Sequence, residues 1–223
     1  MKLIYFSNEF PKDDLQGLFR RLYNHSKDRR YPILARFIHE ATLAVREEVR
    51  QLPTAVKALV PAFETVLNLA DYPELRKGPL GGSLEGVLLC VLEIATLIGH
   101  VPRLYFKEAA DCCSYYENAP ERFDLHAVST YLAGLGLGLL STAAIALCSA
   151  LADVPVIGAE VVRVSFRLGT LVDEISQNLE PRDTSGSPDT WASVVPGAKV
   201  EEVQAELDAI HTREVSCHTV VTR

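Results

Sequence analysis

The sequence has no long basic cluster, and its basic residues are fewer than its acidic residues. It carries 22 Lys and Arg against 29 Asp and Glu, a net charge of −7 over 223 residues, and its one short basic run lies at 27–30. Proteins that bind a phosphate backbone concentrate Lys and Arg on one surface. We therefore expect no nucleic-acid partner.

Glycine and proline are also few, 13 and 12, and aromatic residues make up 8% of the chain. Hydrophobic residues make up 48%, which leaves enough aliphatic surface to bury a sizeable core. This composition excludes global disorder. It predicts one ordinary soluble domain of 24.6 kDa, with part of a second.

The five cysteines are an odd number and lack the spacing of metal ligands. Cys112 and Cys113 are adjacent, which suits neither a zinc knuckle nor a usual disulfide. The apolar run at 1–6 is too short for the hydrophobic region of a secretory signal. We expect a reducing compartment, cytoplasmic localisation and no bound metal.

Hydrophobic periodicity predicts a helix-rich chain with short strands. Residues 2–6 read as a buried strand, and 127–133 as a second. Helices are expected from Asp14 to about Asn24, over about 34–52 on an amphipathic pattern, from Ser83 to 98 in the interior, over about 139–151, over 158–177 and from about Lys199. Pro155 and Gly158 are expected to form the turn before the helix at 158–177, whose apolar set is Val161, Val164, Leu168, Leu171, Val172 and Ile175. The stretch 180–197 has a loop composition, with strand-like residues only at 191–195.

The segment 127–152 carries no formal charge, so a membrane span has to be weighed. Gly134 and Gly138 have the GxxxG spacing of packed transmembrane helices. Against a span, residues 128–132 favour a strand, the glycines interrupt the middle, and neither flank is basic. We expect strand, Gly-rich turn and helix instead, with no membrane contact.

A strand, a tight Gly134-x-Gly136-x-Gly138 turn and a helix are the geometry of a nucleophile elbow. Two other readings stay open. A dinucleotide loop has the spacing G-x-G-x-x-G, but its last position here is Leu139. The glycines are equally compatible with a close-packed turn in a buried α/β core.

Six segments carry a resemblance over nearly the whole chain. They are IYFSNEF at 4–10, HSKDRR at 25–30, VLLCV at 87–91, the run 132–140, GAEVVR at 158–163 and LVDEIS at 171–176. The sequence resembles the starter-unit acyltransferase domain of fungal non-reducing polyketide synthases, closest to those that make melanin and conidial-pigment precursors. The resemblance implies an α/β fold like malonyl-CoA:ACP transacylases, an α/β-hydrolase-like core with a small ferredoxin-like subdomain.

The resemblance also implies an activity. Such domains move a starter acyl group from CoA, or from a fatty-acid synthase carrier, onto an enzyme cysteine and then onto the phosphopantetheine thiol of an acyl carrier protein, with a histidine as base. The implied substrates are acyl-CoA and the carrier protein, and the implied partners are the carrier and ketosynthase domains of the synthase. No tightly bound cofactor is implied.

Residue by residue, the family's GxCxG cysteine falls on Gly136, which has no side chain to hold an acyl group, while Gly134 and Gly138 form the elbow. Glu9 falls in the loop where related transacylases place an amide near the oxyanion hole. Arg167 matches an arginine that grips a substrate carboxylate, although pairing with a nearby acid such as Glu160 or Asp173 explains it equally well.

None of the six histidines inherits the role of base. His211 and His218, the nearest by position, are expected to be solvated, and Cys90 and Cys148 are expected to be core thiols.

The chain is therefore expected to be a truncated domain with an acyltransferase-like core at 1–185, the start of a ferredoxin-like subdomain at 186–214 and an off-pattern tail at 215–223. Residues 101–116 interrupt the family pattern, and a translated intron explains them; sequencing the transcript across these codons tests this. Two hypotheses follow: a starter-loading module that has lost covalent catalysis, and a structural or docking module. Exposed core surface predicts poor solubility for the chain in isolation.

Overall fold

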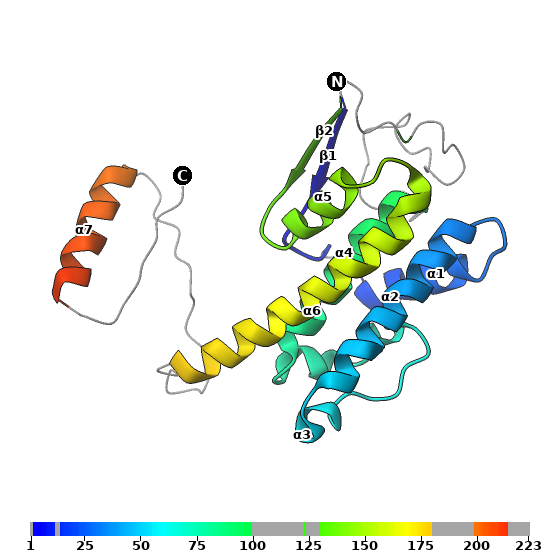
Figure 1. The fold of residues 1–223 in the computed structure, drawn as a ribbon, viewed down its shortest axis with the longest axis horizontal. Helices are drawn as coiled ribbons and strands as arrows, with labels where there is room; N and C mark the ends of the chain where they lie inside the picture. The colour runs from blue at the N-terminus through cyan, green and yellow to red at the C-terminus, as the bar shows by residue number, and fades with distance from the viewer. Residues whose placement is uncertain (1, 12–13, 100–122, 124–129, 180–198, 214–223) are drawn as a thin grey trace. The chain divides into compact units, whose positions relative to one another are not determined.

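The computed structural model describes residues 2–11, 14–99, 123, 130–179 and 199–213. The chain divides into two compact units, Met1–Leu179 and Glu180–Arg223. The elements of the first unit are β1 (Lys2–Phe6), α1 (Leu15–Ser26), α2 (Pro32–Gln51), α3 (Thr54–Lys57), η1 (Val66–Asp71), η2 (Pro73–Lys77), α4 (Gly81–Ile98), β2 (Thr130–Gly134), α5 (Gly138–Ala146), η4 (Leu151–Asp153) and α6 (Val154–Leu179) (Figure 1). In the second unit, α7 (Val200–Arg213) is described. The expected strand at 191–195, the insertion at 101–116 and the tail at 215–223 lie outside the described residues.

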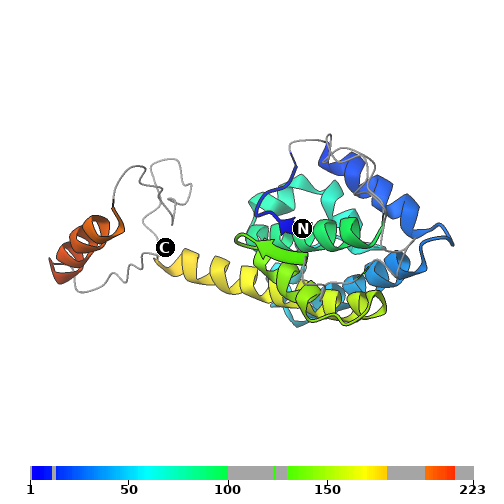
Figure 2. The same cartoon turned by 90° about the horizontal axis from the view of Figure 1, so that it is seen from above.

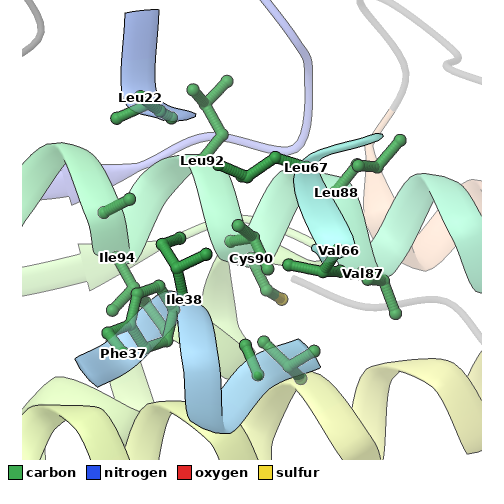
Figure 3. Packing of buried hydrophobic residues seen from close by; sticks show 14 of the residues in the cluster. Leu22, Phe37, Ile38, Val66, Leu67, Val87, Leu88, Cys90, Leu92 and Ile94 are labelled. Carbon is green, nitrogen blue, oxygen red and sulfur yellow. The ribbon is translucent and has the colours of Figure 1, made fainter. Parts of the chain in front are cut away.

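Helix α4 runs through the interior of the first unit, as its nearly continuous apolar sequence predicted. Residues Leu84, Val87, Leu88, Ile94 and Ile98 are buried within the hydrophobic core. Val87, Leu88 and Ile94 are labelled in Figure 3. By length and composition alone this helix could cross a membrane, but 72% of it is buried inside the protein. A core helix of a soluble protein satisfies the same criterion, so we assign α4 to the core.

Helices α2 and α6 pack against one another, and α6 also packs along α4 (Figure 1). The amphipathic prediction for α2 is confirmed, because its apolar face is buried in the core. Pro32 opens the helix at a position where its missing N–H leaves no bond unmade. The helix stops just before Leu52 and Pro53.

The predicted turn before α6 is wrong, because α6 already begins at Val154. Pro155 lies in the first turn, where a helix tolerates proline because the first N–H groups have no intrahelical partner. Gly158 lies inside the helix, at a position that has little room for a side chain. The ring of Phe37 packs there, and its Cε2 would be 2.9 Å from an ideal Cβ on residue 158.

The apolar set identified on α6 is largely not the part of the helix that enters the core. The side chains that enter the core are chiefly those of Val154, Val162 and Phe166. Five of the six residues of the apolar set are exposed: Val164, Leu168, Leu171, Val172 and Ile175. The sequence showed that α6 is rich in apolar residues, but it did not show which of its faces meets a neighbouring helix.

Strands β1 and β2 form a two-stranded parallel sheet, with Lys2 paired to Thr130 and Phe6 to Gly134. The two strands lie side by side in both views (Figures 1 and 2). Helix α5 follows β2 and packs against both strands and against α6. This arrangement brings the end of β1 next to the turn that joins β2 to α5.

Candidate functional site at the Gly-rich elbow

The turn between β2 and α5 has the strand–turn–helix arrangement predicted from the sequence. Strand β2 ends at Gly134 and α5 begins at Gly138. The strand starts at Thr130 among the described residues, and the helix ends at Ala146, five residues earlier than predicted. Gly136, at the apex, is exposed and has φ of +55°. A left-handed backbone conformation of this kind strains any residue with a Cβ, and nucleophile elbows hold their central residue in a strained turn.

The two flanking glycines allow a close approach of backbone to backbone. A Cβ on Gly134 would collide with the hydroxyl of Thr142 and the carbonyl of Gly138. A Cβ on Gly138 would collide with the carbonyl oxygens of Phe6 and Ser7. Both interpretations of the turn, a close-packed turn and a nucleophile elbow, therefore explain why residues 134 and 138 are glycines.

The side chain of Asn8 covers the apex of the elbow. Its Oδ1 accepts a hydrogen bond from the backbone N–H of Leu137, with N and O 2.8 Å apart. A Cβ on Gly136 would overlap Oδ1 and Cγ of the same side chain and would lie 3.0 Å from its Nδ2. The amide of Asn8 thus occupies the position to which a side chain at the apex would project.

Sequence reasoning chose Glu9 for this loop and missed Asn8. Glu9 is exposed, and its backbone N–H donates to Ser7 Oγ over 3.1 Å. The oxyanion-loop role of Glu9 stays a prediction. The signal that was available is the polar Ser7-Asn8-Glu9 sequence that follows a buried strand, in which Asn8 is the residue with an amide.

Arg167 holds a carboxylate of the protein itself. Its Nε and Nη2 donate to Oε2 and Oε1 of Glu48 on α2, both over 2.8 Å. Arg163 approaches the same Glu48 at 3.3 Å and also pairs with Glu47 and Glu160. The hydrogen bonds from Arg167 are the main cause that lowers the pKa of Glu48.

The acid that forms the hydrogen-bonded ion pair with Arg167 is therefore Glu48, another acid than the two suggested by the sequence, Glu160 and Asp173. The side chain of Asp173, a residue of α6, instead lies beside Gly82 and Ser83 at the start of α4. A pocket of about 290 Å³ adjoins the pair between α2 and α6 and is lined by Glu48, Gln51, Leu52, Phe166, Arg167 and Thr170. The contacts described around the elbow do not include Arg167, and its role toward a substrate carboxylate stays a prediction.

A small polar cluster lies where α4, α5 and α6 meet, and sequence reasoning missed it. It comprises Glu93 and Cys90 of α4, Ser141 of α5 and Ser165 of α6. Both carboxyl oxygens of Glu93 are shielded from solvent and form no hydrogen bond of good geometry. Burial raises the pKa of Glu93 to about 7, and the nearby Ser141 hydroxyl and Ser7 backbone offset part of this rise. The available signal was a single acid in the otherwise uncharged, largely apolar run 86–98.

The thiols of Cys90 and Cys148 are buried, as predicted for core residues. Burial raises the pKa of each thiol to about 11, so neither forms a thiolate readily near neutral pH. Cys90 lies among the apolar side chains of α4 and its neighbours (Figure 3). Within the described ranges, no group of three or more His, Cys, Asp or Glu side chains could hold a metal ion. The side chains of His211 and His218 lie outside what the structure describes.

Nearly the whole chain matches a known protein family. A sequence profile described as "Starter unit:ACP transacylase in aflatoxin biosynthesis" matches residues 11–219. The chain belongs to this starter-unit transacylase family.

This chain is similar to parts of several fungal non-reducing polyketide synthases. One from Pseudocercospora fijiensis is 47% identical over 210 residues, which is 94% of this chain and 11% of the relative. One from Arthroderma gypseum is 45% identical and matches 95% of this chain and 11% of the relative, and one from Aspergillus fumigatus is 47% identical and matches 92% and 10%. The chain therefore spans about a tenth of the length of these multidomain relatives.

Proposed function

We propose that this chain is part of a starter-unit transacylase domain that binds acyl-CoA and acyl carrier protein but forms no covalent acyl-enzyme at its elbow. The observation that carries the proposal is the apex of the turn, where Gly136 has a left-handed conformation and no side chain. Family membership and relatives among non-reducing polyketide synthases support the reaction class. The domain is then a malonyl-transacylase-like α/β fold within a cytoplasmic synthase.

The chemistry explains why the apex decides the mechanism. In covalent transfer a thiolate attacks the thioester carbonyl, the CoA thiolate leaves, and the phosphopantetheine thiol of the carrier then displaces the enzyme sulfur. Gly136 supplies no atom for the first bond. The buried Cys90 and Cys148 do not replace it, because their pKa values of about 11 keep them protonated.

The partners and substrates follow from the family. We propose acetyl- or malonyl-type starters as the acyl groups, no tightly bound cofactor, and the carrier and ketosynthase domains of a synthase as partners. Resemblance to the pigment-type synthases makes melanin and conidial-pigment precursors the proposed product class. Arg167 would have to leave Glu48 to bind a malonyl carboxylate, so an uncharged acetyl starter fits the observed ion pair better.

A second candidate is a structural or docking module without acyl binding. The hydrogen bond from the Leu137 N–H to Asn8 favours it, because this N–H is already satisfied without a ligand.

Labelled acetyl-CoA and malonyl-CoA, incubated with the full protein, test the first proposal. Mass spectrometry should find no covalent acyl group on the peptide that contains Gly136, and equilibrium binding should detect acyl-CoA. A stable adduct on that peptide contradicts the loss of covalent catalysis. Absence of acyl-CoA and carrier binding selects the docking module. The Gly136→Cys variant, in which the missing sulfur is restored, is the contrast.

A further inference from the structure

The loop after β1 brings an amide side chain to the turn after β2. Phe6 ends β1, and its carbonyl accepts the N–H of Leu135, so the two loops are joined by backbone as well as by side chain. Asn8 follows two residues later and reaches the N–H of Leu137. The contact joins residues 129 positions apart in the sequence.

The N–H of Leu137 is the group that a substrate carbonyl would need. In a nucleophile elbow, the backbone N–H of the residue after the apex is one of the donors that bind the developing oxyanion. Leu137 follows the apex residue Gly136. Asn8 presents to this donor a carbonyl oxygen at 2.8 Å, the same type of acceptor that an acyl thioester presents.

The space that Asn8 occupies exists because residue 136 is a glycine. A Cβ at this position would overlap the Asn8 side-chain amide. A cysteine at 136 and the observed position of Asn8 therefore exclude one another. Asn8 is exposed, so its side chain can move into solvent without rearrangement of the core.

We propose that Asn8 is an internal plug of the oxyanion site: its side-chain carbonyl holds the Leu137 N–H and keeps an acyl carbonyl out. This inference rests on the proposed function for the identity of the competing ligand. An acyl thioester must displace Asn8 to reach the Leu137 N–H, whereas free CoA, which has no acyl carbonyl, does not compete with it. The plug thus weakens acyl binding in the resting protein and opens when Asn8 is displaced.

Amide exchange in the full protein tests whether Asn8 covers Leu137. We expect hydrogen exchange at the Leu137 amide to become about tenfold faster in Asn8→Ala, because its acceptor is lost. Asn8→Asp keeps an acceptor oxygen and should retain slow exchange. Ser7→Ala, which removes the hydroxyl that accepts the Glu9 N–H, is the matched control in the same loop. Unchanged exchange at Leu137 in Asn8→Ala overturns the proposal.

Amide exchange in Gly136→Cys tests the exclusion without any substrate. The new Cβ should displace the Asn8 side chain, so hydrogen exchange at the Leu137 amide should become about tenfold faster than in the parent protein. The double variant Asn8→Ala/Gly136→Cys should exchange no faster than Gly136→Cys, because the acceptor is already displaced. Exchange at Leu137 that stays as slow in Gly136→Cys as in the parent protein overturns the proposal. Should the cysteine variants fail to fold, the exchange measurement on Asn8→Ala still decides it.

Binding of acetyl-CoA relative to CoA separates this inference from the proposed function. Asn8→Ala should raise the affinity for acetyl-CoA about fivefold and leave that for CoA unchanged, the effect of one internal hydrogen bond. Faster exchange at Leu137 with no gain for acetyl-CoA overturns the competition between plug and acyl group. If no variant binds CoA or acetyl-CoA, the proposed function fails, and the exchange rates at Leu137 still decide whether Asn8 is a plug.

Discussion

Arg167 and Glu48 form a two-point ion pair between α6 and α2, with Nε and Nη2 each 2.8 Å from a carboxylate oxygen. The Glu48 side chain is only 5% exposed, whereas that of Arg167 is 59% exposed. A shielded carboxylate needs a counter-charge, while an exposed guanidinium can be hydrated. The pair therefore stabilises the contact between α2 and α6 chiefly by satisfying Glu48.

We predict that Arg167→Ala lowers the free energy of unfolding, because the buried Glu48 carboxylate loses its two-point partner and keeps only the weaker contact with Arg163. Urea denaturation at pH 7 measures this. The control is Glu47→Gln, which removes one of the two exposed acids that pair with Arg163 and should change stability little. If Arg167→Ala unfolds like the parent protein and loses only malonyl-CoA binding, Arg167 is a substrate contact and its pair with Glu48 is incidental.

Acid should weaken the same contact. The pKa of Glu48 is lowered in the folded state, so its contribution is present above the pKa of the unfolded chain, near 4.5, and is lost as the pH falls below that. In Glu48→Gln the loss of stability between pH 5 and pH 3 should be smaller. Thermal unfolding followed at several pH values checks this, and an unchanged acid limb contradicts it.

Glu93 should make stability depend on pH in the opposite direction. Its pKa is raised to about 7, mainly because burial disfavours the charged form. The sign follows from linkage: stability is fully present below about 4.5 and is lost as the pH rises through about 7. The groups around it are the Cys90 thiol, the Ser141 hydroxyl and the Ser7 backbone, and none of these brings a positive charge.

Replacing Glu93 by glutamine should raise the melting temperature at pH 8 by several degrees and leave it nearly unchanged at pH 5. Scanning calorimetry between pH 5 and 8 measures the difference. Glu85→Gln, at an exposed position of the same helix, provides the comparison. A melting temperature that falls equally with pH in the parent protein and in Glu93→Gln excludes Glu93 as the cause.

The glycines of the elbow should differ from those elsewhere in their tolerance of alanine. In Gly134→Ala the new Cβ meets the backbone carbonyl of Gly138, which cannot move without displacing α5. We expect a loss of about 2–4 kcal/mol, of the order found for strained or overpacked sites. Chemical denaturation measures it.

Gly17, within α1, is the matched control. The atoms that its Cβ would meet belong to the Asp14 side chain, which is exposed and can rotate away. Gly17→Ala should be neutral or should stabilise the protein by up to about 1 kcal/mol, because alanine favours a helix. Equal effects at positions 17 and 134 would mean that the elbow is less tightly packed than its contacts indicate.

Much of the framework was predictable from periodicity, and the errors concern contacts between elements. The apolar run of α4 and the Gly134-x-Gly136-x-Gly138 turn are local patterns, so their structures could be predicted. The position of Asn8 depends on the parallel pairing of β1 with β2, which joins segments far apart in sequence. The exposed face of α6 has the same cause: an apolar stripe shows that a helix needs a partner and does not identify that partner. The raised pKa of Glu93 depends on burial of α4 near α5 and the loop after β1, although the isolation of this acid in a largely apolar run was a visible sign.

The sheet carries an exposed apolar face that should promote self-association of this chain. Leu3, Tyr5 and Tyr131 are 61%, 56% and 54% exposed on neighbouring parallel strands. Parallel sheets are usually covered on both faces, and contiguous exposed apolar surface favours association. We expect sedimentation velocity to show concentration-dependent oligomers of the isolated chain, which threonine at all three positions should reduce while retaining strand propensity. Replacing Leu43 and Leu59, which are exposed outside the sheet, by threonine should leave the oligomers unchanged. A monodisperse monomer over the full concentration range would show that this face does not associate.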